Sequence, residues 1–201
     1  MASLYLVRHG EIDANVQRLW FGSTDGELNA RGVLQASRLG PYFQNQYPEI
    51  SVIYSSPLKR TFKTAESLGA PFGIVPVAHE GLREYGIGEW EGEPYEKLAA
   101  ERRFFERLTE NPGFAPPGGE SVHDVRDRMI AALTEIRDRH HGEDVAIVSH
   151  GAAMAIALAH LLSGKCYPFH DYHMSNTGIS HLHWHDEPVL QVFDDIGHLP
   201  D

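Results

Sequence analysis

A histidine between an arginine and a glycine directly follows a short apolar run near the start of the chain. Leu4–Val7 are apolar, aromatic or β-branched, which is typical of a buried strand. Arg8, His9 and Gly10 then place a cation, a potential nucleophile and a flexible residue where that strand would leave its sheet. Ligands of open α/β sheets bind at the carboxyl ends of the strands. The simpler alternative is that Arg8 and His9 are ordinary loop residues, because short motifs also occur by chance.

A second stretch of the chain repeats this arrangement. Asp144–Val148 read as a buried strand, Ser149, His150 and Gly151 follow, and Ala152–Leu162 have the composition of a helix. A turn between a strand and a helix offers backbone N–H groups and a helix N-terminus, which together favour an anion. The two turns therefore predict two histidines that face one anionic group.

Further segments extend this pattern along the chain. In order, they are Arg8-His9-Gly10-Glu11 with Asn15, Ser55–Thr61 with Thr64 and Ala65, Leu82-Arg83-Glu84 with Gly88–Gly92, and Ser149-His150-Gly151. Together they resemble the histidine phosphatase superfamily, the family of phosphoglycerate mutase-like enzymes. The run Gly88–Gly92 is similar to the phosphatase branch of that family. The resemblance spans nearly the whole chain and implies one domain over residues 1–201. Its expected fold is a phosphoglycerate mutase-like three-layer α/β/α sandwich, with a mostly parallel central sheet and an antiparallel edge hairpin.

The resemblance also implies a role for each site residue. The implied catalytic residues are Arg8, His9, Arg60, Glu84 and His150, and the implied phosphate- and substrate-binding residues are Arg8, Asn15, Phe21, Gly22, Arg60, His150 and Gly151. Phosphoryl transfer needs an in-line nucleophile, charge stabilisation and a protonated leaving group. His9 would attack phosphorus and become phosphohistidine. Arginine forks would bind the phosphoryl oxygens, and Glu84 would protonate the leaving oxygen.

Four details of this expected site bear on how it would work. The neighbouring arginines should lower the pKa of His9 and keep it neutral for attack. Glu84 must be protonated when it acts, so we expect an activity optimum on the acid side of neutral. Ile12 stands where the family usually has threonine, and one hydroxyl near the site is lost. Asn15 also has a simpler interpretation, as a turn residue that satisfies its own backbone.

Composition excludes several classes of function. The 201 residues suit one α/β domain, and the formal net charge of −11 argues against a nucleic-acid-binding protein. No apolar run is long enough to span a bilayer, so no membrane contact is expected. We see no signal peptide, and the single cysteine, Cys166, fits a reducing compartment. The sequence therefore predicts a cytoplasmic enzyme with a small-molecule phosphomonoester as its substrate.

Local patterns predict the elements that would position the site. A helix is expected from Ala30 to Tyr47, with Val33 and Leu34 among its apolar positions. Two further helices should start at Pro57, with Ser56 as N-cap, and at Val122, with Ser121 as N-cap. The remaining helices are expected over 94–108 and from Ala152 until Gly164. Strands are expected at 52–54 and 73–77, and residues 179–185 and 189–193 should form the antiparallel hairpin. Residues 111–119 are rich in proline and glycine and should form a loop over the mouth of the site.

The thirteen histidines raise the question of a metal site. His181, His183 and His185 would share one face of a strand, and His170 and His173 lie in one loop. No carboxylate or further histidine is spaced to complete a shell, so we expect neither a metal site nor a cofactor. A histidine-rich metal protein nevertheless stays an alternative.

Three further points stay open in the sequence. The chain could be a cofactor-dependent phosphoglycerate mutase or a non-catalytic phospho-ligand-binding domain. The outer edge of the hairpin could pair with a second copy, so a homodimer is open. The leaving group also stays open. Trp20, Phe21, Trp90 and Phe114 would suit an apolar or ring-bearing alcohol, and they could equally be core residues.

Overall fold

Six strands form a single sheet with a parallel centre. The computed structural model describes residues 2–200, and its strand order is β3-β2-β4-β1-β5-β6. Neighbouring strands from β3 to β1 run parallel, and β5 and β6 complete the sheet as an antiparallel hairpin. The bounds are β1 (Ala2–Arg8), β2 (Ile50–Ser55), β3 (Val77–Ala78), β4 (Asp144–Ser149), β5 (Ile179–Trp184) and β6 (Pro188–Asp195). This confirms the mostly parallel sheet and the edge hairpin.

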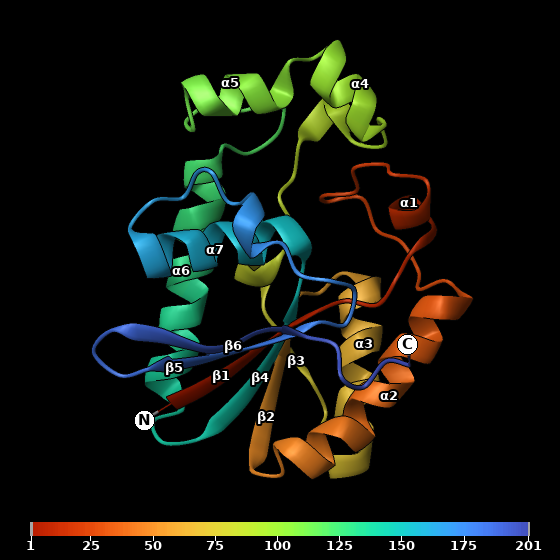
Figure 1. The fold of residues 1–201 in the computed structure, drawn as a ribbon, viewed down its shortest axis with the longest axis vertical. Coiled ribbons are helices and arrows are strands. Elements are labelled where there is room, and N and C mark those ends of the chain that lie inside the picture. The colour runs from red at the N-terminus through yellow and green to blue at the C-terminus, as the bar shows by residue number, and fades with distance from the viewer. Residues whose placement is uncertain (1, 201) are drawn as a thin grey trace.

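Helices cover both faces of the sheet and give the expected three layers. α2 (Ala30–Gln46) and α3 (Lys59–Gly69) lie on one side, and α6 (Val122–Arg139) and α7 (Gly151–Ser163) lie on the other (Figure 1). Side chains of β1 alternate between the layers, because successive residues of a strand point to opposite faces. Leu4 and Leu6 are buried among residues of α6 and α7, whereas Tyr5 and Val7 are buried among residues of α2 and α3.

Short elements complete the chain. They are α1 (Asp13–Val16), α4 (Tyr95–Ala100), α5 (Phe104–Glu110) and four 3₁₀ turns at Ala70–Phe72, Glu80–Leu82, Gly88–Trp90 and His170–Tyr172. Figure 1 shows α4 and α5 at the top of the molecule, beyond the strand ends where α1 also lies. Among residues 2–200, no helix is long and apolar enough to cross a membrane. β6 is an outer edge of the sheet, and its pairing with a second copy stays a prediction.

Caps start α2 and α6, and end α7, where the sequence predicts. Asn29 Oδ1 accepts the Gly32 N–H at 2.8 Å ahead of α2. Ser121 Oγ accepts the Asp124 N–H at 3.1 Å, and the Asp124 carboxylate accepts the Ser121 N–H at 2.8 Å, which is a capping box. Gly164 ends α7 with φ +72°, a conformation that favours glycine.

The expected helix start at Ser56 and Pro57 is wrong by two residues. The Ser56 N–H donates to the Val148 carbonyl at 3.0 Å, so the chain still follows the sheet there. Leu58 is the extended N-cap residue, and α3 begins at Lys59. The Ser56 hydroxyl contacts His150 and accepts the N–H of Leu58 at 3.4 Å, so it caps no N–H group within α3 itself.

Three other expectations need correction. The helix over 94–108 is two helices, because Arg103 between α4 and α5 has φ +51° and cannot continue a right-handed helix. The strand at 73–77 is only Val77–Ala78. Val33 and Leu34 lie on the exposed side of α2, which buries Ala36, Leu39 and Phe43.

Candidate active site

The two strand–histidine–glycine turns lie side by side at one edge of the sheet. Arg8 pairs in register with Ser149 across β1 and β4, and the His9 N–H donates to the Ser149 carbonyl at 3.1 Å. The His9 and His150 rings are 5.3 Å apart between centroids. The parallel neighbours β1 and β4 therefore bring together two histidines that lie 141 positions apart in the sequence (150 − 9).

One ring nitrogen of His9 is hydrogen-bonded, and the other has a free lone pair. His9 Nδ1 lies 2.7 Å from the Gly10 carbonyl oxygen, which can only accept a hydrogen bond, so Nδ1 carries the proton. Nε2 then keeps its lone pair. Burial, Arg60 and Arg8 hold the pKa of His9 well below its ordinary value of 6.5, while the hydrogen bond to Gly10 raises it. The imidazole is therefore neutral at neutral pH, as a nucleophile requires.

Two arginines accompany His9. Arg60 is fully buried, and its guanidinium donates to the carbonyls of Phe21, Gly22 and Thr24 at 2.9–3.2 Å. Arg8 Nη1 donates to the Met174 carbonyl at 2.6 Å. The Nε atom of each arginine is buried without a hydrogen-bond partner in the described part of the chain. An unpaired buried donor is costly, so these two positions suit an anionic ligand.

Glu84 occupies the helix N-terminus at which we expected the substrate anion. Its carboxylate accepts the N–H groups of Tyr85 at 2.8 Å, Ala152 at 3.2 Å and Ala153 at 2.8 Å. The last two belong to the first turn of α7. Burial lowers the pKa of Arg8 and Arg60, and the Glu84 carboxylate opposes that shift in both. Glu84 is therefore close enough to act electrostatically on both arginines.

His150 lies behind His9. The ring is fully buried, and Nε2 is 2.8 Å from the Ser56 hydroxyl. Burial is the main reason that the pKa of His150 is well below 6.5, and Arg60 and His9 lower it further. His150 is therefore neutral at neutral pH and can donate a hydrogen bond but adds no positive charge. Nδ1 has no partner among residues 2–200.

A cavity of about 220 Å³ opens beside these groups. Its polar lining includes Arg8, His9, Asn15, Arg60, Glu84, His170 and His173, and its apolar lining includes Ile12, Leu19, Trp20, Phe21, Tyr95, Phe105, Gly151, Ala152 and Phe169. Of the expected site residues, His150 and Gly22 do not line it. Gly22 contributes its carbonyl to Arg60. Asn15 Oδ1 accepts from the Ile12 N–H and from Asn176 Nδ2, so only the Asn15 amide N–H groups remain for a ligand.

Aromatic residues line the cavity, but they are only partly those that the sequence suggests. Trp20 and Phe21 line it, while Trp90 and Phe114 belong to the core around α6 and α7. Tyr95 of α4 and Phe105 of α5 take part instead. The loop 111–119 does not line this cavity. These residues come from separate segments, and no local pattern marks them as neighbours.

The other histidines lie apart from the cavity, except His170 and His173. The His181 ring stacks on Tyr5 at 4.3 Å and lies 4.5 Å from the His183 ring, and His185 pairs with Asp186 at 2.8 Å. In the part of the chain that the structure describes, no three His, Cys, Asp or Glu side chains are grouped as metal ligands. The expected absence of a metal stays a prediction.

The two buried neutral histidines predict a fold that weakens in acid. In the unfolded chain His9 and His150 protonate near pH 6.5, whereas in the folded chain their pKa values are well below that. As the pH falls below 6.5 the unfolded state binds more protons, so the free energy of unfolding should fall by about 1.4 kcal/mol per pH unit for each histidine. Above pH 6.5 they contribute no slope.

Urea unfolding between pH 5 and 8 would measure this effect. Other groups also titrate in this range, so the comparison is between the native chain and His9→Ala. Below pH 6.5, the free energy of unfolding of the variant should depend less steeply on pH, by the contribution of one histidine. Identical slopes would show that His9 takes up its proton in the folded state.

Comparisons with known proteins agree with this architecture. Residues 4–195 match the family model for the histidine phosphatase superfamily, branch 1. A phosphoglycerate mutase-like protein of Arabidopsis thaliana is 32% identical over 204 residues, which cover 98% of this chain and 87% of the relative. A phosphoserine phosphatase from Entamoeba histolytica, solved in complex with 3-phosphoglyceric acid, has a TM-score of 0.88 at 29% identity over all of both chains. A mycobacterial glucosyl-3-phosphoglycerate phosphatase has a TM-score of 0.84 at 30% identity, over 96% of this chain and 98% of that chain.

Proposed function

This chain is a phosphatase of the histidine phosphatase superfamily, and we propose that it hydrolyses phosphomonoesters without a metal ion, through a phosphohistidine on His9. The observation that carries the proposal is the free Nε2 of a neutral, buried His9 next to Arg8 and Arg60. A neutral imidazole is a nucleophile, and two guanidinium groups supply the positive charge that phosphoryl oxygens need.

The first half of the proposed reaction transfers the phosphoryl group to the enzyme. His9 Nε2 attacks phosphorus, and the bond from phosphorus to the ester oxygen breaks as the N–P bond forms. Arg8 and Arg60 bind the phosphoryl oxygens and stabilise their charge. Glu84, in its protonated form, gives its proton to the ester oxygen, so the leaving group departs as a neutral alcohol.

The second half releases phosphate. Water enters in place of the alcohol, and the Glu84 carboxylate takes a proton from it as the oxygen attacks phosphorus. The N–P bond breaks, inorganic phosphate leaves, and His9 returns to its neutral form. Glu84 ends this half protonated, ready for the next ester. His150 holds the His9 side of the site by packing against its ring, and Asn15 is proposed as a further donor to the phosphate.

The substrate is proposed to be a small phosphorylated metabolite. The cavity holds about 220 Å³, which suits a phosphoryl group and a leaving group of modest size. Trp20, Phe21 and Phe105 form part of its wall, and such side chains favour the apolar face of an alcohol. The Entamoeba relative that was solved with 3-phosphoglyceric acid supports a small ester as ligand.

A phosphate-release screen with chelator present tests the proposal. The expected result is release from several phosphomonoesters, unchanged by chelator, with a rank order that identifies the leaving group. Release that chelator abolishes would overturn metal independence. No release from any ester, together with conversion of a phosphoglycerate only when bisphosphoglycerate is added, would identify a mutase instead.

A further inference from the structure

An arginine outside the cavity uses three donors of its guanidinium on the segment around Glu84 and the other two on Glu120. Arg128 on α6 donates from Nη1 to the carbonyls of Gly81 at 3.1 Å and Arg83 at 2.6 Å, and from Nη2 to the carbonyl of Glu84 at 2.9 Å. Its two remaining N–H groups, on Nε and Nη2, bind the two carboxylate oxygens of Glu120 at 2.7 and 2.9 Å. Arginine has five N–H donors, and all five are used here.

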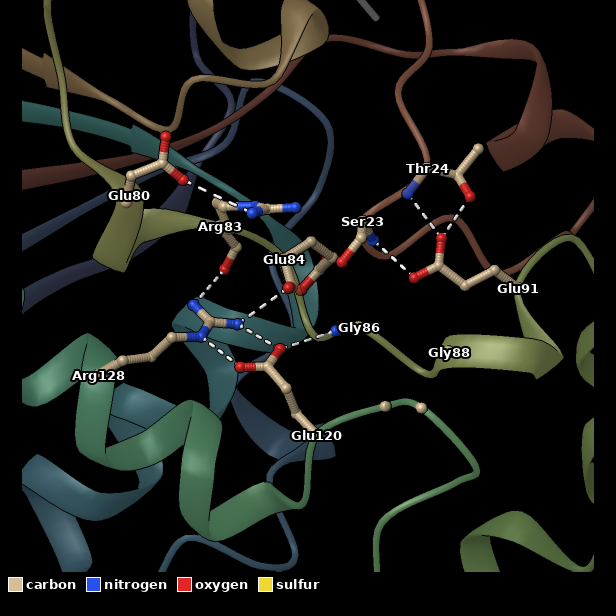
Figure 2. A pocket seen from close by; sticks show the side chains of 12 residues that line it. Ser23, Thr24, Glu80, Arg83, Glu84, Gly86, Gly88, Glu91, Glu120 and Arg128 are labelled. Atoms are coloured by element: carbon tan, nitrogen blue, oxygen red, sulfur yellow. Dashed lines mark hydrogen bonds and ion pairs between the residues drawn. The ribbon is translucent and has the colours of Figure 1, made fainter.

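Glu120 extends this network to the backbone that follows Glu84 in the sequence. Glu120 Oε2 also accepts the N–H of Gly86 at 3.0 Å. Figure 2 shows Arg128 and Glu120 face to face, with the backbone of 83–86 running past them. The pair therefore holds backbone groups both before and after Glu84, in a stretch that has no regular helix or strand between Leu82 and Gly88.

Charged groups in the surrounding hollow pair with one another or with nearby backbone N–H groups. The hollow has a volume of about 580 Å³, and its internal pairs are Glu80 with Arg83, Glu91 with the backbone of Ser23 and Thr24, and Glu120 with Arg128 (Figure 2). An anionic ligand would have to compete with Glu80 and Glu120 for the two arginines. The arrangement therefore suits a structural role in the backbone around Glu84.

We propose that Glu120 and Arg128 are positioning residues that hold Glu84 in place as the proton donor. The inference rests on the proposed function, because it needs Glu84 to protonate the leaving group. The Glu84 side chain also depends on its own backbone, since its carboxylate accepts the N–H of the next residue, Tyr85, at 2.8 Å. A shift of the 83–86 backbone would move the carboxyl group away from the ester oxygen.

Arg128→Lys is the variant that tests this. Lysine keeps the charge but cannot copy the planar fork or supply five donors. For an alkyl phosphate, whose alkoxide leaves poorly, kcat/KM should fall by about 10- to 100-fold, because a displacement near 1 Å can cost that much. For 4-nitrophenyl phosphate, whose phenoxide leaves without protonation, the loss should stay within about threefold. Both ratios are measured against the native chain.

Controls separate positioning from a general loss of structure. Arg139 lies on the same helix and pairs with exposed Glu135. Arg139→Lys should change kcat/KM for neither substrate. In Glu84→Gln, adding Arg128→Lys should cost nothing further for the alkyl ester, because residues that act through one group are not additive. If Arg128→Lys does not fold, Glu120→Gln carries the test and should show the same selective loss.

Each outcome decides a different claim. A selective loss for the alkyl ester that vanishes in the Glu84→Gln background supports the inference. An equal loss for both esters, or no loss for either, overturns it and leaves a structural ion pair. If the native chain releases phosphate from neither ester, the proposed function fails first.

Discussion

His9→Ala should leave a folded protein that has lost its turnover. Without Nε2 there is no covalent step, and removal of a catalytic nucleophile typically lowers kcat by about 10⁴- to 10⁶-fold. The arginines remain, so the variant should still bind a phosphomonoester. Steady-state phosphate release measures the first effect, and calorimetric titration with a good substrate of the native enzyme measures the second.

Chemical trapping adds a direct test of the intermediate. The native chain, mixed with a ³²P-labelled ester and stopped within milliseconds, should carry label that is stable to alkali and lost in acid, as a phosphohistidine is. His9→Ala should carry none. His141→Ala, which removes an exposed histidine beyond α6, should label normally. Near-native turnover in His9→Ala would contradict the mechanism.

The positions of His9 and His150 at neighbouring strand ends can be predicted from the sequence. Apolar runs followed by His-Gly predict two strands and two turns, and neighbouring parallel strands place their carboxyl ends at one edge of a sheet. His9 and His150 therefore follow from local signals and one topological rule. Arg60 and Glu84 came from the family resemblance, and the structure places both against the same cavity.

Contacts between segments far apart in the sequence cannot be predicted in this way. Ser56 looked like a helix cap because serine before proline is a common start, and its hydroxyl contacts His150 instead. The cavity wall combines residues of α4, α5 and the loop before β5. Arg128 lies on α6 with nothing in its sequence neighbourhood to connect it to Glu84.

The N-terminus of α7 binds an anion, as the local rule predicts, but the anion is not the expected one. Backbone N–H groups at a helix start favour an anion, and the sequence suggested the substrate. In the structure, that anion is the Glu84 carboxylate. The pattern identified the electrostatic site, but the choice between an internal and an external anion depends on how closely residue 84 approaches in the fold.

Glu84→Gln should slow phosphoryl transfer in proportion to how much the leaving group needs a proton. Glutamine has nearly the same size and keeps one oxygen to accept from the first turn of α7, but it cannot give up a proton. For an alkyl phosphate we expect kcat/KM to fall by about 10²- to 10⁴-fold, the range typical of a lost general acid. For 4-nitrophenyl phosphate, the loss should be much smaller.

The pH profile gives an independent readout of the same group. In the native enzyme kcat/KM for the alkyl ester should fall toward alkaline pH, because only protonated Glu84 can act as the acid. His9 cannot cause that fall, since its low pKa keeps it neutral from mildly acidic pH upward. Glu84→Gln should lose the alkaline fall together with the rate. A variant that keeps it, or a native profile that stays flat into alkaline pH, would assign the proton to another group.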